Sequence, residues 1–397
     1  MNENKRKPAL HGVRILDLSR VLAGPWCTMI LADLGADVIK IENPDGGDET
    51  RGWGPTFAGG ESAYYLCTNR NKRSITVDIA TSEGQRILRE LAAECGVLVE
   101  NFKTGALAKY GLDYESLRKV RPDVIYCSIS GYGRTSPLAD RPGYDYVVQA
   151  EAGIMAITGV PDGEPMKAGV AVADLFTGMY AVQAILAAII ARSNDGQGQL
   201  IDLALFDCGL AMLANVASAN LISGEESRRL GNAHPSVVPY QLLPTADSDI
   251  VLAVGNDRQF RILCEQVLER PDVARDERFT SNNARIANRE SLIPILKEVL
   301  RGRSAAEWYR RLSTTGIPTG MVRTVGEALR SPEVAARDMV ATVSHPTAGE
   351  LKLVSSPIRM SGTPVRKPSP PPLLGQHSEE ILREMNLRRS TSVQPAS

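Results

Sequence analysis

Asp174 stands among small and apolar residues, where a long helical pattern begins. Residues 169–178 read GVAVADLFTG, and an apolar helical pattern continues to about Arg192. A carboxylate beside a helix N-terminus in apolar surroundings can act as a nucleophile. Asp is also a favoured N-cap residue, and such a cap stabilises a helix by about 1 kcal/mol. From these residues alone both roles stay open, and the N-cap role is favoured.

A second candidate is a cluster of cations before a predicted strand. Arg70, Lys72 and Arg73 lie within four positions of a chain whose formal net charge is only −1. Such a cluster can bind a phosphate or a carboxylate. A solvated charged turn is the alternative, and composition favours it.

Two further segments contain small or unusual residues. Residues 20–25 read RVLAGP, and small residues before a helix leave its N-terminal N–H groups accessible to an anion. They do not form the G-x-G-x-x-G pattern, so a plain turn is favoured. Residues 229–235 read RLGNAHP, in which His234 could line a cleft, but no Ser or Cys motif supplies it with a nucleophilic partner.

Alternating strand and helix patterns must position these residues. Strand patterns occupy residues 13–18, 37–42, 74–79, 97–100, 124–130 and 199–203, and helical patterns occupy residues 25–34, 82–95, 114–120 and 174–192. Strands that alternate with such helices indicate an α/β fold with a doubly wound parallel sheet.

The second half of the chain has a different pattern of strands and helices. After Gly231 one strand pattern, residues 249–254, precedes charged helical segments, which predicts a smaller second domain. Strand patterns at 339–343 and 351–354, a proline-rich connector and a helix at 377–385 follow. We expect the polar tail from Arg388 to be disordered.

The composition of the chain argues against several classes of protein. The 397 residues include 45 Lys and Arg against 46 Asp and Glu, which argues against a nucleic-acid or membrane-surface binder. Four histidines and six cysteines without a C-x-x-C pair give no expected metal site. The N-terminus lacks the apolar core of a signal peptide, and the longest apolar run, residues 179–191, is shorter than the roughly 20 residues that span a bilayer. We expect a cytoplasmic protein that does not bind membranes.

Taken together and in order, the motifs resemble the family III CoA-transferases, the CaiB/BaiF group of formyl-CoA transferase type. The resemblance covers residues 12 to about 387. The motifs that carry it are GVRILDL with AGP (12–25), LGADVIKIE (34–42), GDETR (47–51), NKRS (71–74), VENF (99–102), GYG (131–133), ADLxxG (173–178) and PLLGQH (372–377).

The resemblance implies that Asp174 is the nucleophile. Its carboxylate would form an anhydride with the donor acyl group and then an aspartyl-CoA thioester, from which CoA passes to an acceptor carboxylate. We expect an Asp of ordinary pKa, about 3.9, to be ionised without a general base. Acyl-CoA is then a substrate, and no cofactor is bound permanently.

The family's CoA contacts match positions in four parts of this sequence. They are Val21, Leu22, Ala23, Val77, Asn101, Phe102 and Lys109. Two departures concern the nucleotide end of CoA and the substrate loop: a family arginine is replaced by Asn43, and residues 231–235 replace the glycine-rich loop of the formyl type.

Within the family, residues 69–74, 231–241 and 370–377 resemble the type that acts on succinyl-CoA and glutarate. The expected acceptor contacts are Arg70, Tyr144, Gly231, Asn232 and His234, with Arg70 as the hypothetical holder of the second carboxylate.

Two alternatives belong to other classes. The α-methylacyl-CoA racemases share the GYG motif but use a histidine where this chain has Tyr144, so the proton carrier is missing. The second alternative is a non-catalytic CoA-binding protein.

The resemblance also implies an architecture. A Rossmann-like large, CoA-binding domain would combine residues 1–225 and 335–397, with a smaller α+β domain, residues 226–334, inserted between them. Two ring-like subunits would interlock as a homodimer.

Overall fold

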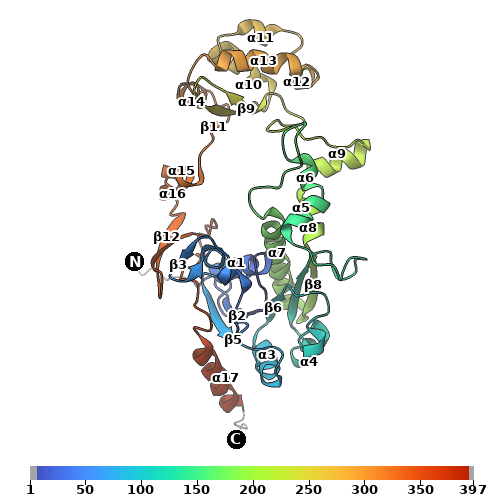
Figure 1. Cartoon of the computed structure of the whole chain (residues 1–397), viewed down its shortest axis with the longest axis vertical. Helices are drawn as coiled ribbons and strands as arrows, with labels where there is room; N and C mark the ends of the chain where they lie inside the picture. Colours follow the sequence, from blue (N-terminus) through green and yellow to red (C-terminus); the bar gives the residue numbers. More distant parts are fainter. Residues whose placement is uncertain (1–6, 393–397) are drawn as a thin grey trace. The chain divides into compact units, whose positions relative to one another are not determined.

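The computed structural model describes residues 7–392, and the chain divides into two compact units. Unit 1 combines Met1–Ile154, Lys167–Gly224 and Pro332–Ser397, and unit 2 combines Met155–Met166 with Glu225–Ser331. The chain therefore leaves unit 1 and returns to it, as the blue-to-red colouring in Figure 1 shows.

Unit 1 is built on a six-stranded parallel sheet with the order β5-β2-β1-β6-β7-β8. The strands are β1 (Arg14–Asp17), β2 (Asp37–Glu42), β5 (Lys72–Thr76), β6 (Val97–Glu100), β7 (Ile125–Ser130) and β8 (Gln199–Ala204). Ranked along the chain, this is the 3-2-1-4-5-6 order of doubly wound dinucleotide-binding sheets. The predicted α/β fold with a parallel sheet is confirmed.

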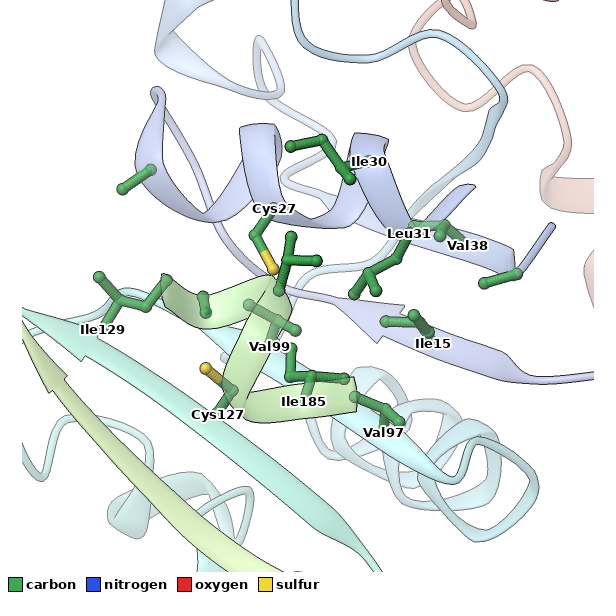
Figure 2. Packing of buried hydrophobic residues seen from close by; sticks show 14 of the residues in the cluster. Ile15, Cys27, Ile30, Leu31, Val38, Val97, Val99, Cys127, Ile129 and Ile185 are labelled. Carbon is green, nitrogen blue, oxygen red and sulfur yellow. The ribbon is translucent and has the colours of Figure 1, made fainter. Parts of the chain in front are cut away.

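Each face of the sheet carries its own apolar core. On one face Ile15, Val99 and Cys127 pack with Cys27 of α1 (Ala23–Asp33) and Ile185 of α7 (Val172–Asp195), as Figure 2 shows. The other core joins neighbouring strand residues to helices α3 (Ser82–Glu94), α4 (Tyr114–Val120) and α17 (Ser378–Ser392). Successive strand residues point to opposite faces, so the apolar runs are buried on both sides.

Helix α7 is also the one described helix that is long and apolar enough by itself to cross a membrane. The bent pair α8 (Leu205–Met212) and α9 (Asn215–Ser223) passes the same test only when counted together. Because α7 packs against α1, β7 and β8, its apolar composition follows from its place in the core of unit 1.

Short elements complete unit 1. They are the 3₁₀ turns at Glu49–Gly52 and Ala108–Tyr110, the hairpin β3 (Phe57–Ala58) and β4 (Glu61–Ser62), helices α2 (Ala63–Leu66), α5 (Asp145–Glu151) and α16 (Pro332–Ala336), and the hairpin β12 (Val340–His345) and β13 (Gly349–Val354). Helix α6 (Ile154–Ile157) lies at the junction with unit 2.

Unit 2 contains a three-stranded antiparallel sheet and several helices around one apolar core. The strands are β9 (Tyr240–Pro244), β10 (Asp249–Ala253) and β11 (Thr319–Met321), and the helices are α10 (Asp257–Ile262), α11 (Pro271–Arg275), α12 (Asn282–Ala287), α13 (Arg289–Leu300), α14 (Ala305–Ser313) and α15 (Val325–Leu329), with a π-helical turn at Leu263–Val267.

The end of the chain differs from the sequence-based expectation. The segment from Arg388, predicted to be disordered, continues α17 as far as Ser392. No proline or glycine stands between His377 and Pro395, so nothing in the local sequence interrupts the helix. The last five residues lie outside the described part of the chain.

Candidate active site

The candidate site lies where the sheet reverses its winding. β1 and β6 are neighbours, and the chain continues from their carboxyl ends into the turn at Arg20 and the segment at Asn101. The Asn101 side chain joins the two segments: its Oδ1 accepts the Arg20 N–H at 2.9 Å, and its Nδ2 donates to the Arg20 carbonyl at 2.7 Å. In doubly wound folds this reversal point is the usual place for a ligand.

A cavity of about 200 Å³ opens at this point. It brings together most of the residues predicted for the site: Val21, Leu22, Ala23, Asn101, Phe102, Tyr144 and Asp174. Cations and one further carboxylate also line it: Arg20, Lys103, Arg141 and Glu49.

A second cavity of about 260 Å³ shares Arg20, Glu49 and Phe102 with the first, so the two adjoin. It contains Val77, one of the predicted CoA contacts, and Asn43. The two cavities thus form one groove across the carboxyl ends of β1, β2 and β6.

Asp174 is the third residue of α7 and not its cap. The N-cap position is Ala171, and the capping oxygen comes from a distant residue, Asp145. Asp145 Oδ1 accepts the N–H of Ala173 at 2.8 Å and the N–H of Asp174 at 3.3 Å. The N-cap role favoured by sequence is therefore wrong, and the Asp174 carboxyl is left to face the cavity.

The pKa of Asp174 also differs from the ordinary value expected from the sequence. Burial and the neighbouring negative charge of Asp145 raise the pKa of Asp174 to about 7. Tyr64 of α2 interacts electrostatically with this carboxylate. Burial, and then the negative charge of Asp174, raise the pKa of Tyr64 to about 12. At neutral pH Tyr64 stays protonated, and Asp174 is near its midpoint.

The small residues of the two helices allow them to approach closely beside Asp174. A Cβ on Gly178, one turn after Asp174, would lie 2.7 Å from the Ala23 carbonyl oxygen, so only glycine fits there. A Cβ on Gly24 would lie 2.3 Å from the Ser19 Cβ. Gly178 of the ADLxxG motif thus lets the start of α7 approach the start of α1, and Gly24 of the AGP motif lets α1 pack against Ser19 in the turn that precedes it.

Helix α1 begins at Ala23, and its first N–H groups have no carbonyl one turn earlier within the helix. Leu22 and Ala23 line the cavity that contains Asp174. Their N–H groups, at the positive end of the helix dipole, can donate to an oxyanion that forms beside Asp174.

The three cations of the NKRS region form separate ion pairs. Arg70 binds Asp33 through two contacts of 3.0 and 2.5 Å and donates to the Val354 carbonyl at 3.1 Å. Lys72 pairs with Asp17, and Arg73 pairs with Asp37. Among the described residues neither cavity lining includes Arg70, and its guanidinium is occupied, which is a correction to its predicted role as acceptor holder.

The other predicted contacts lie elsewhere. Lys109 is exposed, its ammonium 4.7 Å from the centre of the Tyr110 ring, and it is in neither described cavity lining. Gly231, Asn232 and His234 belong to unit 2, where the Gly231 N–H donates to the Gly159 carbonyl and His234 Nδ1 accepts the Ser236 N–H.

Sequence reasoning missed Asp145 and Tyr64. The GYD motif at 143–145 contains the Asp145 carboxylate, but the resemblance assigns a role only to Tyr144. A Cβ on Gly143 would lie 2.6 Å from the Gly131 Cα, so contact between these two glycines brings the GYD segment against the end of β7. Nothing near Tyr64 in the sequence pointed to Asp174.

Comparison with known proteins identifies the family of the whole chain. The model of CoA-transferase family III matches residues 10–378. A succinate–glutarate CoA-transferase from Agrobacterium fabrum is 49% identical over 98% of each chain, and the human succinyl-CoA:glutarate CoA-transferase is 44% identical over 96% of this chain and 87% of its own length. A crystal structure of a CaiB/BaiF family protein from Brucella suis, 45% identical, covers 96% of this chain and 100% of that chain with a TM-score of 0.85. The chain therefore belongs to CoA-transferase family III and is a CoA-transferase.

Proposed function

We propose that this enzyme moves CoA from succinyl-CoA to a dicarboxylate such as glutarate, through covalent intermediates on Asp174. The observation that carries the proposal is the Asp174 carboxyl in the same cavity as the N-terminal turn of α1. The substrates follow from the two relatives named for succinate or succinyl-CoA and glutarate.

The reaction needs no proton transfer. Ionised Asp174 attacks the thioester carbonyl, an anhydride forms, and CoA leaves as a thiolate. The thiolate attacks the aspartyl carbonyl of the anhydride, which releases the donor acid and leaves an aspartyl-CoA thioester. The acceptor carboxylate attacks that thioester and releases CoA thiolate. The thiolate then takes the acceptor acyl group from the second anhydride and frees Asp174.

Each step passes through a tetrahedral oxyanion. The N–H groups of Leu22 and Ala23 are the proposed donors to it, because they are fixed and need no reorganisation. Since burial raises the pKa of Asp174, its ionised form is less stabilised by solvent than an exposed carboxylate.

For CoA itself we propose a path along the groove, past Val21–Ala23 and Asn101–Phe102, with Val77 at the nucleotide end. Lys109, on the exposed surface, is kept as a contact for the phosphates. Asn43 lines the second cavity, where Glu42, Asp45 and Asp78 also lie.

The proposed acceptor contacts are Tyr144, Gly231, Asn232 and His234. Arg70 is no longer among them, because its role is to stabilise the fold through its ion pair with Asp33. We further propose a cytoplasmic, interlocked homodimer. Its large domain would comprise residues 1–225 and 335–397, with residues 226–334 as the inserted domain.

The test is a screen of carboxylates as acceptors from succinyl-CoA, followed by chromatography of the acyl-CoA products. We expect glutarate to be among the best acceptors and Asp174→Asn to abolish transfer. Transfer that survives in Asp174→Asn would overturn the mechanism. Equal transfer to monocarboxylates and dicarboxylates would overturn the acceptor class.

A further inference from the structure

The turn that presents the proposed oxyanion donors has a strained backbone at Val21. Its φ is +70°, in the left-handed region, and valine is β-branched. For such a residue this conformation is an outlier that costs free energy and persists only where the surroundings enforce it. Val21 lines the cavity and directly precedes Leu22 and Ala23.

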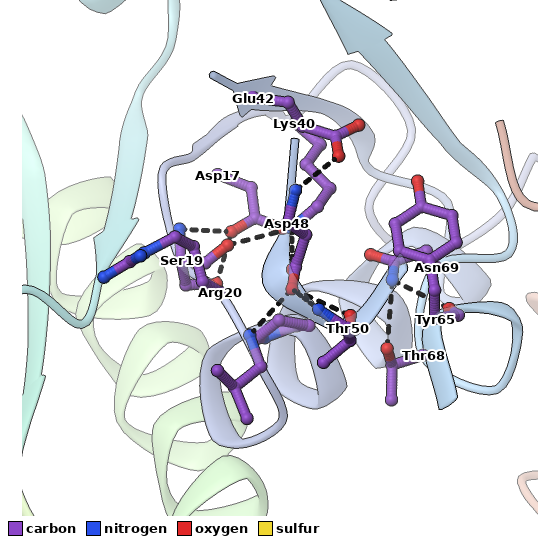
Figure 3. A network of polar contacts seen from close by, with 12 residues as sticks. Asp17, Ser19, Arg20, Lys40, Glu42, Asp48, Thr50, Tyr65, Thr68 and Asn69 are labelled. Carbon is purple, nitrogen blue, oxygen red and sulfur yellow. Dashed lines mark hydrogen bonds and ion pairs between the residues drawn. The ribbon is translucent and has the colours of Figure 1, made fainter. Parts of the chain in front are cut away.

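A buried ion pair holds this residue in place. Asp48 Oδ1 accepts the Val21 N–H at 3.3 Å, and Asp48 Oδ2 binds Lys40 Nζ at 2.9 Å. Both side chains of the pair are completely buried. Lys40 Nζ also donates to the carbonyl of Ser19 at 2.9 Å, so the pair holds the turn on both sides of Arg20 (Figure 3).

The pair is itself fixed and ionised. Thr50 donates to Asp48 Oδ1 from its backbone at 3.1 Å and from its hydroxyl at 2.8 Å. Burial alone would raise the pKa of Asp48, but Lys40 and the hydrogen bonds from Lys40 and Thr50 lower it to about 2. Both charges are thus present throughout the neutral range.

We propose that Lys40 and Asp48 are positioning residues, which hold Val21 in its strained conformation and thereby aim the N–H groups of Leu22 and Ala23 at the reacting carbonyl beside Asp174. The inference rests on the proposed function and deepens it. Removal of the pair lets Val21 relax to a negative φ, which turns the two donors away from the oxyanion.

Both members of the pair are replaced together, because an unpaired buried charge would itself destabilise the fold. For Lys40→Met with Asp48→Leu we expect kcat per folded molecule to fall by about 100-fold, the lower end of the loss caused by removing an oxyanion donor. Loss of oxyanion donors acts in the transition state and lowers kcat. Lys40 and Asp48 also line the second cavity, so the KM for succinyl-CoA is measured separately to report any lost contact with CoA.

Adding Val21→Gly should restore most of the lost kcat, because glycine adopts a positive φ without strain. A merely structural pair would give no such rescue. The matched control is Arg285→Met with Asp257→Leu, which removes a buried cation and its partner in unit 2. We expect it to lower stability without changing kcat per folded molecule.

An unchanged kcat in the folded double variant, or a loss that Val21→Gly does not reverse, would overturn the inference. If the double variant does not fold, the loss of kcat caused by Asp48→Asn is measured twice, once in the wild-type protein and once in the Val21→Gly protein. Equal losses in the two proteins would overturn the inference. Transfer by the wild-type protein in the same assay tests the proposed function separately.

Discussion

At the scale of single residues, two carboxylates at the start of α7 have different tasks. Asp145 accepts the N–H groups of Ala173 and Asp174, and its charge faces Asp174. Its second oxygen accepts from Gln149 Nε2 at 2.6 Å, which fixes the carboxylate. Asp145 therefore orients the nucleophile and also makes it harder to ionise.

This arrangement predicts the pH profile. Only ionised Asp174 attacks, so kcat/KM should fall as the pH drops below about 7. Asp145→Asn keeps an oxygen for the two N–H groups but removes the negative charge, which lowers the pKa of Asp174. We expect the acid limb of kcat/KM to move down by on the order of one pH unit, measured from pH 5 to 9.

The other charged or titratable groups described around the cavity are unchanged in this variant: Tyr64, Tyr144, Arg20, Glu49, Lys103 and Arg141. The control is Asp207→Asn, an exposed carboxylate of α8. An acid limb that stays in place in Asp145→Asn would mean that Asp145 acts only as a cap.

Arg70 carries a second prediction at this scale. Arg70→Met leaves Asp33 buried without its cation, which should lower the free energy of unfolding by about 3–5 kcal/mol. The KM for glutarate should stay within about twofold, because the guanidinium is already occupied. Urea unfolding and acceptor titration measure the two quantities.

The double variant Arg70→Met with Asp33→Leu is the control, and it should recover most of the lost stability. A raised KM for glutarate with unchanged stability would return Arg70 to the acceptor site.

At the scale of elements, the site depends on the contact between α1 and α7. Gly178 faces the Ala23 carbonyl and the Trp26 side chain, so the two helices meet one turn from Asp174. A single methyl group at this contact must push the start of α1 away from α7. Displacements of about 1 Å near a reacting centre can cost about 100-fold in rate.

Gly178→Ala should therefore lower kcat by about tenfold or more and the free energy of unfolding by about 1–3 kcal/mol. Gly302→Ala is the matched control, because its added Cβ would lie 3.1 Å from the Val299 carbonyl oxygen in unit 2. It should affect stability but not kcat. Full activity in Gly178→Ala would show that the helix contact does not position the site.

The same elements show what sequence could predict. The strands were found because their apolar runs are buried on both faces, and β2 and β6 have the predicted bounds. The start of α7 was misjudged because Asp174 is the locally favoured cap, whereas the capping oxygen belongs to Asp145, 29 positions away. The partner of Arg70 is 37 positions away. Such pairings depend on tertiary structure, which no local pattern records.

At the scale of the whole molecule, the C-terminal helix α17 and the residues before it pack against the sheet of unit 1. The His377 N–H donates to the Ser74 carbonyl at 2.9 Å, and Arg73 binds Glu380 and Glu384 of α17 at 2.9 Å. Ile381 is fully buried in the core that contains Ile39 and Ile75. The N-terminal strands therefore share one core with residues more than 300 positions later.

If this core is cooperative, Ile381→Ala should destabilise the whole of unit 1 by about 2–5 kcal/mol, as a buried deletion within the sheet would. Hydrogen exchange should then quicken at the amides of β2 and β5 as well as along α17, and Leu88→Ala in the same core should give the same pattern. Glu379→Ala, on the exposed side of α17, is the control and should change little. Faster exchange confined to α17 would mean that the helix frays from a sheet that is stable without it. A sheet that loosens with α17 would mean that unit 1 gains its full stability only once the last segment has docked.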